Sequence, residues 1–520
     1  MKKLAFIVIS LVFLLIVTST VFYIVNSQDR HPGYSLNLDL PQESGGEATQ
    51  LKVGLAKLPI TPPIADSWID ADSNAKYQPK KGDRFIDKNN NGKFDAYWLA
   101  GFQNQRPAQG VHDELWARAV VWDDGQLCVA LVVLDAIGLF HDDVITIREK
   151  VADQNWKIDF VMASSTHNHE TPDLMGLWGG RLFKSGVNEN YLQFVQNQAV
   201  AAIGQALANA RPAVIQLTKI DSTASDLVRD SRPPRVLDDV IHLMQFCDAV
   251  TQEPFGILMN WGNHPETLAS DNLLITSDFC YYWLQGMESG IVYDGDVKRQ
   301  GMGGIAVFAN GAIGGLMTTL GCAVHDPWLN KDFKKATFDK ARAQGYRLAD
   351  LVLNAVEKGE WETVADPTMK LRAQTFLFRL QNKYFRLGGA LGVFHRGFVK
   401  YNNLRSEVDL LKIGPAWLLT IPGEINPEIV NGGIENPEGA DFPGAPIEAP
   451  PIRELMKGKY NFVIGLGNDE VGYIMPKTHW DTKPPYTYGA KKPFYGEVNS
   501  LGPDAGPTLY EEVKKIIEDF

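Results

Sequence analysis

The apolar positions along the chain predict strands separated by helices. Residues 128–134 form a continuous apolar run that ends at Asp135, and residues 160–163 form a second one. Such runs are typical of strands buried on both faces. Between them, residues 142–150 have the spacing of an amphipathic helix. A strand, a helix and a strand in this order indicate an α/β core.

The same alternation continues toward the C-terminus. Apolar residues recur at helical spacing over residues 188–210, 344–358 and 510–520. Further strands are expected at the apolar runs 51–57, 240–246, 255–261, 369–380 and 413–421. The pattern therefore predicts a mixed β-sheet core flanked by helices, in a single large domain over residues 51–520.

The first 25 residues differ from this body. Lys2 and Lys3 precede an apolar segment over residues 4–25. About 20 apolar residues can span a bilayer, and lysines before the span keep the N-terminus inside. We expect residues 1–25 to be a signal anchor on the cell membrane, with an extracellular catalytic domain; a cleaved signal peptide and a secreted protein are the alternative. Residues 26–50 are polar and are expected to form a tether.

Composition narrows the possible partners. The 520 residues carry 50 Lys and Arg against 62 Asp and Glu, which gives a net charge of −12. A nucleic-acid partner is therefore not expected. The four cysteines are far apart in the sequence, which argues against a CxxC metal site or a dense disulfide framework. We expect all four to be buried free thiols.

A loop rich in Asp and Asn follows the first expected strand. Residues 87–95 read Asp-Lys-Asn-Asn-Asn-Gly-Lys-Phe-Asp, with side-chain oxygens at positions 1, 3, 5 and 9 and glycine at 6. This spacing matches the first part of a calcium-binding loop. Position 12 is Trp98 rather than Glu, so a closing carboxylate would come from Asp70, Asp72 or Asp83. An ordinary Asn/Gly turn is the alternative. The residues expected to bind structural Ca²⁺ are Asp87, Asn89, Asn91 and Asp95.

Polar clusters follow several of the expected strands. Ligands of open α/β sheets collect beyond the carboxyl ends of strands, so these clusters are candidates for a common site. Each residue taken singly also fits a hydrogen-bonded loop residue or a capping group. Together they offer a possible set of metal-binding side chains from four strand ends: His167 with His169, His264, Glu424 and Tyr473.

The order of these motifs resembles the catalytic domain of neutral/alkaline (non-lysosomal) ceramidases. Thr-His-x-His at 166–169 is followed by Asn-His-Pro-x-Thr at 263–267, Pro-Gly-Glu at 422–424 and Asn-Asp-x-x-Gly-Tyr at 468–473. The resemblance covers roughly residues 51–520, and the four motifs in this order are specific. It implies an α/β hydrolase that cleaves an amide such as that of ceramide, an N-acyl sphingosine.

The resemblance also implies roles for individual residues. By position, a zinc ion would be held by His167, His264, Glu424 and Tyr473. His169 would stand beside the metal and handle a proton or the substrate carbonyl, and Arg232 would contact the substrate. Asp135 is expected to support the ligands from a neighbouring strand end. Zinc with an open coordination position can activate water toward an amide or ester carbonyl.

Three features depart from the family pattern. Gly315 stands where the family has a catalytic serine, although its backbone could still help to bind an oxyanion. Thr318 and Thr319 are close to that position but out of register. Residues 170–173 replace a glycine-rich segment, and no C-terminal immunoglobulin-like domain is expected. We therefore expect metal-dependent chemistry without a covalent intermediate.

The expected function is that of an exported zinc-dependent hydrolase of an amide or ester bond. Its expected partners are a small-molecule or lipid amide substrate and, through the N-terminal helix, a membrane. Two alternatives stay open: a metallohydrolase of another amide, such as a cell-wall or sugar-derived one, and a catalytically inactive protein that uses the metal pocket for binding. Turnover of an acyl-amide panel, with and without chelator, distinguishes them.

Overall fold

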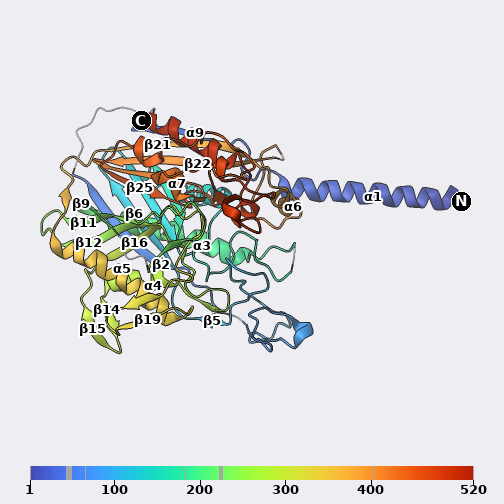
Figure 1. Cartoon of the computed structure of the whole chain (residues 1–520), viewed down its shortest axis with the longest axis horizontal. Helices are drawn as coiled ribbons and strands as arrows, with labels where there is room; N and C mark the ends of the chain where they lie inside the picture. The colour runs from blue at the N-terminus through green and yellow to red at the C-terminus, as the bar shows by residue number, and fades with distance from the viewer. Residues whose placement is uncertain are drawn as a thin grey trace.

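Two mixed β-sheets packed against each other form the centre of the molecule (Figure 1). Apart from some side chains of the first helix, the computed structural model describes residues 2–41, 50–64, 66–181, 183–221, 226–400, 402–518 and 520. Within these residues the larger sheet has nine strands and the smaller has five. Helices cover both outer faces, which confirms the predicted mixed-sheet α/β core.

The larger sheet has the order β16-β12-β11-β9-β2-β6-β7-β8, with β20 beside β9. The pairs β7–β8 and β12–β16 are parallel and the other pairs are antiparallel. Strands β2 and β9 pair over only two residues each, so the sheet separates into two halves there. The strand bounds are β2 (Lys52–Pro59), β6 (Trp116–Asp123), β7 (Cys128–Leu134), β8 (Phe160–Ser165), β9 (Arg211–Asp221), β11 (Val240–Asp248), β12 (Pro254–Trp261), β16 (Ile305–Asn310) and β20 (Glu362–Thr363).

The smaller sheet corrects one predicted strand. Its order is β1-β21-β22-β23-β25, with only β23 and β25 parallel. The single strand predicted at 413–421 is in fact the end of one strand and the whole of the next, because Gly414 and Pro415 form a hairpin turn between them. The strand bounds are β1 (Asn37–Leu40), β21 (Met369–Arg379), β22 (Asn403–Ile413), β23 (Ala416–Thr420) and β25 (Tyr460–Ile464).

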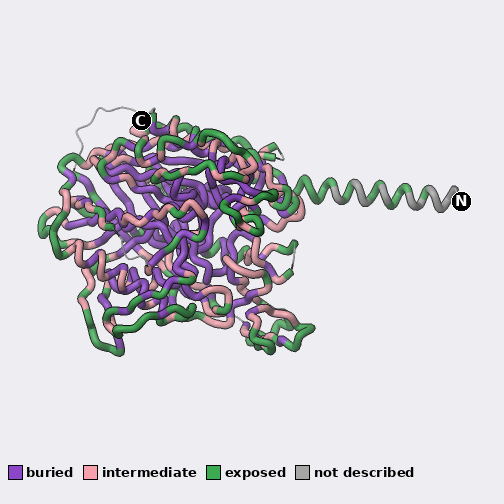
Figure 2. The backbone as a smooth tube through the Cα atoms, viewed as in Figure 1, coloured by how far each residue is buried: buried purple, intermediate pink, exposed green. Residues whose placement is uncertain are grey.

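The core lies between the two sheets and under the outer helices. Val53 and Trp122 of the larger sheet pack in one cluster with Leu371 and Phe462 of the smaller sheet. Burial of a large apolar side chain stabilises the fold by about 1.5–3 kcal/mol, so this interface holds the sheets together. Figure 2 shows the buried residues concentrated in these central layers.

Helices cover both outer faces. Helices α2 (His141–Ala152) and α3 (Glu189–Ala208) pack on one half of the larger sheet, and α4 (Phe279–Glu288) and α5 (Phe338–Lys358) pack on the other. Helix α9 (Ala505–Glu518) covers the smaller sheet. Helix α5 begins six residues before the predicted start at 344, because the Thr337 side chain accepts a hydrogen bond from the Lys340 amide and caps it.

Short elements complete the described chain. Several of them form two-stranded pairs outside the two main sheets. Their bounds are β3 (Ser67–Ile69), β4 (Arg84–Ile86), β5 (Gly110–Val111), β10 (Arg229–Asp230), β13 (Leu274–Ile275), β14 (Ile291–Tyr293), β15 (Asp296–Arg299), β17 (Met317–Thr318), β18 (Val324–Asp326), β19 (Lys331–Phe333), β24 (Glu424–Ile425), β26 (Tyr473–Ile474), α6 (Lys383–Ala390), α7 (Pro427–Asn431), α8 (Ile452–Leu455), η1 (Pro79–Lys81), η2 (Lys477–His479), η3 (Thr487–Gly489) and η4 (Gly496–Asn499).

Helix α1 (Lys2–Ser27) projects away from the body (Figure 1). Its C-terminal end contacts the body, where the Ser27 carbonyl accepts a hydrogen bond from the Phe398 amide at 3.3 Å. In the part of the chain that the structure describes, we find no helix with the length and apolar character of a membrane span. The membrane anchor therefore stays a prediction.

The predicted tether at 26–50 is corrected in part. Residues 37–40 form β1, which pairs with β21 at the edge of the smaller sheet and so belongs to the folded body. Polar Asn37 and Asp39 alternate with leucines, a period that suits an edge strand and that the overall polarity of the segment obscures. Residues 42–49 lie outside the described residues. The prediction for the cysteines is confirmed, since all four are buried free thiols.

Candidate metal centre and its cavity

The predicted metal ligands come together where strands from both sheets end. His167 and His169 follow β8, and His264 follows β12. Glu424 and Tyr473 follow β23 and β25 of the smaller sheet, and they lie opposite each other in the parallel pair β24–β26. Segments far apart in the sequence therefore supply one site.

Asn310, the last residue of β16, connects these strand ends. Its side-chain amide donates to the Thr166 carbonyl at 2.8 Å and to the Asn263 carbonyl at 2.9 Å. These two residues directly precede His167 and His264. Its own carbonyl accepts from the amide of Gly465, which follows β25. A single buried side chain thus fixes both histidine loops relative to the smaller sheet.

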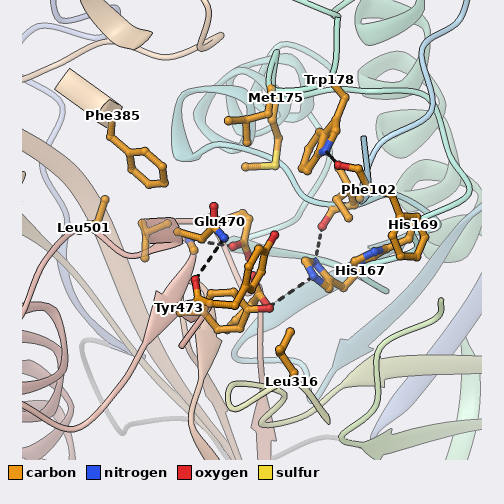
Figure 3. Close-up of a pocket in the computed structure, with 18 of the residues that line it drawn as sticks. Phe102, His167, His169, Met175, Trp178, Leu316, Phe385, Glu470, Tyr473 and Leu501 are labelled. Carbon is orange, nitrogen blue, oxygen red and sulfur yellow. Dashed lines mark hydrogen bonds and ion pairs between the residues drawn. The ribbon is translucent and has the colours of Figure 1, made fainter. Parts of the chain in front are cut away.

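The imidazoles of His167 and His264 are each held so that one ring nitrogen faces the centre. Nδ1 of His167 lies 2.7 Å from the Ile137 carbonyl, and Nδ1 of His264 lies 2.7 Å from the Met317 carbonyl. A carbonyl oxygen can only accept, so each Nδ1 carries a proton, and each Nε2 presents a lone pair to the centre when its ring is neutral. The two Nε2 atoms lie 3.5 Å and 3.0 Å, respectively, from Oε2 of Glu424. Tyr473 is hydrogen bonded to the same carboxylate, and Figure 3 shows Tyr473 and His167 among the residues that line one pocket.

This arrangement fits a divalent metal. Nitrogen lone pairs, a carboxylate and a phenol are the donor types that zinc accepts. The backbone carbonyls that hold Nδ1 orient the rings as they do in metal sites. The ligand atoms of His167, His169 and His264 also lie within 4.8 Å of one another, so His169 is close enough to join or flank the same ion.

Burial and neighbouring charges set the protonation of the centre. Burial lowers the pKa of His167 to about 4. Burial, together with the neighbouring His167 and His264 rings, holds the pKa of His169 well below its usual value. Burial also opposes protonation of His264, but the hydrogen bond and charge of Glu424 outweigh it and raise its pKa. His167 and His169 are therefore neutral at pH 7, the form in which imidazole binds metal or accepts a proton.

Hydrogen bonds hold the backbone of His169, while its ring nitrogens make none within the described residues. Its amide donates to the Pro265 carbonyl at 3.0 Å, and its carbonyl accepts from the buried guanidinium of Arg106. Neither ring nitrogen has a hydrogen-bond partner among the described residues, and Nδ1 lies 3.4 Å from Oε2 of Glu266. Glu266 in turn bonds to the Thr318 side chain. The position of the ring is thus fixed by its backbone, and Nδ1 and Nε2 stay available to accept or donate a proton.

A cavity of about 730 Å³ opens beside the centre. This volume is within the usual range for a small-molecule site. His167, His169 and Glu424 line one part of it. The rest is mostly apolar, with aromatic and aliphatic side chains from several elements: Phe102, Phe140, Met175, Trp178, Leu316, Phe385, Phe394, Phe398 and Leu501.

Arg232 is not among the residues that line the cavity, and its predicted contact with the substrate stays a prediction. Its side chain is buried, with the guanidinium bonded to both Glu497 oxygens at 2.7 and 3.0 Å and to the His479 carbonyl. Arg229, three residues earlier on β10, lines the cavity instead. The Arg-Asp-Ser-Arg sequence offers two arginines, and only the position of Glu497 shows which one is buried.

The segment around Gly315, where the family has a serine, places one threonine side chain at the cavity. Gly315 has a φ of +74°, and a Cβ there would lie 3.0 Å from Oδ1 of Asp230. Its neighbour Leu316 and Thr318 line the cavity. Thr318, which the sequence places out of register, presents its hydroxyl to Glu266 at the site. Thr319 is fully buried and bonds to the Leu227 carbonyl, so it serves the fold.

Asp135 lies behind the centre. Its carboxylate accepts hydrogen bonds from Ser277 Oγ at 2.9 Å and from the Trp116 amide at 2.9 Å. It also lies 3.5 Å from the hydroxyl of Thr166, one residue before His167. Burial raises the pKa of Asp135 to about 6. Asp135 therefore braces the first histidine loop and does not touch the metal-binding atoms through any contact that we observe.

The predicted calcium loop folds on itself. The side-chain amides of Asn89 and Asn91 donate to Oδ2 of Asp95 at 2.7 and 2.6 Å, and the carboxylate of Asp87 accepts the backbone amides of Asn91 and Gly92. Most of these side chains are exposed. The alternative closing ligands, Asp70, Asp72 and Asp83, form a group whose oxygens lie within 4.8 Å of one another. Calcium binding by this loop stays a prediction.

Three residues at the cavity were not predicted. Glu266, Thr318 and Glu470 all line it, and all three are buried. Glu266 stands two residues after His264, and Glu470 stands three residues before Tyr473. A carboxylate so near a candidate ligand is a signal that the sequence offers, but the direction of its side chain depends on the fold.

Comparisons with known proteins bear on the fold. No family model matches the sequence, and no curated protein matches it. A crystal structure of neutral ceramidase from Pseudomonas aeruginosa is similar, with a TM-score of 0.63, 16% identity, and coverage of 91% of this chain and 74% of the ceramidase. A structure described as ceramidase complexed with C2 has a TM-score of 0.62, 15% identity, and coverage of 90% and 75%. The chain therefore has the fold of a neutral ceramidase, as the order of its motifs predicted.

Proposed function

We propose that this protein is a metal-dependent hydrolase that cleaves the amide bond of an N-acylated substrate with a long apolar chain, as a ceramidase does. One observation carries the proposal: Nε2 of His167 and Nε2 of His264 point at one carboxylate, Glu424, on the wall of a largely apolar cavity. Lone pairs directed at a buried carboxylate repel it unless a proton or a metal cation lies between them, and the convergence of two imidazoles on one carboxylate favours the metal. The similarity in fold to neutral ceramidase supports the same reaction class.

The ligand set defines the chemistry. His167, His264, Glu424 and Tyr473 would hold zinc, which supplies Lewis acidity that polarises a carbonyl and lowers the pKa of water. The neutral ring of His169, with no other hydrogen-bond partner among the described residues, can accept a proton from water and return it to the leaving amine. Glu266 lies 3.4 Å from that ring and would stabilise it once it is protonated.

The cavity supports an apolar substrate. Its walls are mainly aromatic and aliphatic, and they meet the metal centre at His167 and His169. Burial of an acyl chain against such walls contributes about 25 cal/mol per Å² of apolar surface, enough to position the amide at the centre. Phe102 packs edge-on against His169, with ring centroids 5.1 Å apart, so the apolar wall extends to the reacting groups.

The proposed route has no covalent intermediate. Gly315 has no side chain to attack with, and Thr319 is committed to the fold. Thr318 is the hydroxyl of this segment that lines the cavity, and it donates to Glu266 rather than to an imidazole. A hydroxyl needs an adjacent base to act as a nucleophile, so mass spectrometry of protein quenched during turnover should find no acyl adduct on Thr318. Such an adduct would replace this route with a nucleophilic one.

The test is turnover of an acyl-amide and acyl-ester panel by the full chain, before and after metal removal. We expect hydrolysis of long-chain amides that stops with chelator and returns with zinc. The His264→Ala variant should be inactive, and the exposed His325 provides the matched control, His325→Ala, which should retain full activity. Cleavage restricted to short polar amides would favour a cell-wall or sugar-derived substrate. Zinc binding without any turnover would indicate a binding protein and would overturn the proposal.

A further inference from the structure

The imidazoles at the centre are oriented in two different ways. Nδ1 of His167 and Nδ1 of His264 each donate to a backbone carbonyl at 2.7 Å, which sets the plane of each ring. The buried ring of His169 has no hydrogen-bond partner among the described residues, and Oε2 of Glu266 lies 3.4 Å from its Nδ1. An imidazole that handles protons is normally oriented by a hydrogen bond to a third group. The orientation of His169 must therefore come from the residues packed around its ring.

A short turn at residues 100–102 packs directly on the His169 ring. A Cβ at Gly101, where φ is +91°, would lie 2.4 Å from Cγ of His169, so only glycine lets the backbone approach the ring this closely. The next residue, Phe102, meets the ring edge-on with centroids 5.1 Å apart (Figure 3). The turn therefore restricts the orientation that the ring can adopt.

One buried guanidinium connects this turn to His169. Arg106 is fully buried, and its Nη2 donates to both the Ala100 carbonyl and the His169 carbonyl. Its guanidinium carbon lies 5.0 Å from the centroid of the Phe102 ring, within the distance of a cation–π contact. Arg106 thus contacts the turn on both sides of Gly101, together with the backbone of the residue whose ring the turn orients.

The guanidinium is itself held by groups outside the cavity. Nη1 of Arg106 donates to Oε2 of Glu170 at 3.2 Å, and the same oxygen accepts from the side-chain amide of Asn272 at 2.8 Å. The Glu170 amide donates to Oδ1 of Asn168 at 3.0 Å. Arg106 is not among the residues that line the cavity, so any effect that it has on a substrate passes through other residues.

We propose that Arg106 is a positioning residue that fixes the His169 ring for proton transfer at the metal centre. The proposal rests on the proposed amide hydrolysis and deepens it. The guanidinium joins the backbone of His169 and the turn at 100–102 into one unit, so the ring keeps its orientation without a hydrogen bond of its own. Arg106→Lys keeps the charge but loses the planar fork that bonds both carbonyls and Glu170 at once. A shift of about 1 Å in a reacting group can lower the rate by about 100-fold.

The first measurement follows the ring itself and needs no turnover. Two-bond ¹H–¹⁵N spectra of the full chain with ¹⁵N-labelled histidine report the ring nitrogens, and His→Ala variants at 167, 169 and 264 assign the signals of the centre. Arg106→Lys should shift or broaden the His169 signal and leave the signals of His167 and His264, and the zinc affinity, unchanged. Arg106→Met, which removes every donor, should have a larger effect on the same signal.

The matched control is Arg299→Lys. Arg299 of β15 also donates to a carboxylate and a backbone carbonyl, both of Asp350 in helix α5, so the same change is made to a similar guanidinium elsewhere. This variant should alter none of the three signals. Thermal unfolding confirms that each variant is folded. An unchanged His169 signal in Arg106→Lys would overturn the proposal.

The second measurement is a double-mutant cycle on turnover of a long-chain acyl amide. Arg106→Lys should lower kcat about 10- to 100-fold with little change in KM. It should have no further effect in the His169→Ala background, because its influence passes through that ring. A general loss of structure would lower activity by the same factor in both backgrounds, and that result would overturn the proposal. A shifted His169 signal in a zinc-loaded protein that hydrolyses no amide would refute only the proposed function.

Discussion

The chain has two regions whose residue spacing predicts a metal site, and the structure treats them very differently. In the buried centre, the side chains come from four strand ends and point their free atoms at one another. In the exposed loop at 87–95, the side chains come from nine consecutive residues and satisfy one another by hydrogen bonds. The polar atoms of the centre are shielded from solvent, whereas those of the loop can form hydrogen bonds with water.

The difference distinguishes the centre, which we propose to hold a metal ion, from a loop whose polar groups are already satisfied without one. Backbone carbonyls fix His167 and His264 before any ligand arrives, so little conformational entropy is lost on binding. In the loop, Asp95 must lose its hydrogen bonds from the side-chain amides of Asn89 and Asn91 before it can bind an ion. We therefore expect tight binding with a chemical role at the centre, and weak binding with a structural role at the loop.

The largest expected effect comes from removal of a central ligand. His264→Ala should lower turnover of a long-chain acyl amide by about 10⁴-fold or more, because several kcal/mol of metal stabilisation are lost. Metal analysis should show the zinc content falling with it. Asp87→Ala should retain both zinc and turnover. A His264→Ala protein that keeps zinc and activity would remove the centre from the account.

The second effect separates the ligands from the proton-handling residue. His169→Ala should retain zinc but lose about 10²–10⁴-fold in kcat, which is the usual contribution of one general acid–base group. Its free ring nitrogens motivate this expectation. If His169→Ala instead loses zinc in proportion to activity, then His169 is a ligand and the three-histidine set is the correct one.

The third effect concerns the buried ion pair of Arg148 and Glu407, which lies behind the centre. Arg148 bonds to both oxygens of the buried Glu407 at 2.6 and 2.8 Å and lies 3.4 Å from Asn468, at the start of the segment that leads to Tyr473. Arg148→Met leaves that carboxylate unpaired and should reduce the free energy of unfolding by about 3–5 kcal/mol.

The exposed ion pair of Lys298 and Asp296 offers the control for this buried ion pair. Lys298→Met should change the free energy of unfolding by less than about 1 kcal/mol in the same urea titration. Equal effects of the two substitutions would mean that the buried network contributes no more than a surface pair.

The smallest expected effect is at the exposed loop. Calcium at about 100 times its dissociation constant would stabilise the fold by about 2.7 kcal/mol, so Asp87→Ala should lower the melting temperature more in calcium than in chelator. Turnover should stay unchanged in both conditions. An identical melting temperature for wild type and variant in both conditions would indicate that the loop is an ordinary Asn/Gly turn that does not bind calcium.

The sequence predicted the elements that follow a simple period and the ligands that follow motifs. Strand β7 matches its prediction residue for residue, since an uninterrupted apolar run has few other structures. Each of His167, His264, Glu424 and Tyr473 follows an apolar run, and the resemblance to neutral ceramidases implied this set of four. The structure brings all four together.

The sequence was less informative where the answer depends on distant partners. Nothing near Arg232 in the sequence indicates that Glu497 will bind it, and nothing near Asn37 indicates that β21 has an open edge. Glu470 gave the same difficulty, because nothing near it in the sequence indicates that its side chain lines the cavity. Local patterns therefore predict elements, while burial and pairing between elements decide which polar side chains are free to act.

The most direct measurement titrates metal-free protein with zinc and follows both zinc binding and turnover of a long-chain acyl amide. The account predicts that activity rises in proportion to zinc and reaches its plateau at one tightly bound equivalent per chain. It also predicts that Glu424→Gln weakens this binding and lowers the plateau, while Asp87→Ala does neither. Full turnover in the metal-free protein, or tight zinc binding that Glu424→Gln leaves unchanged, would contradict the central claim.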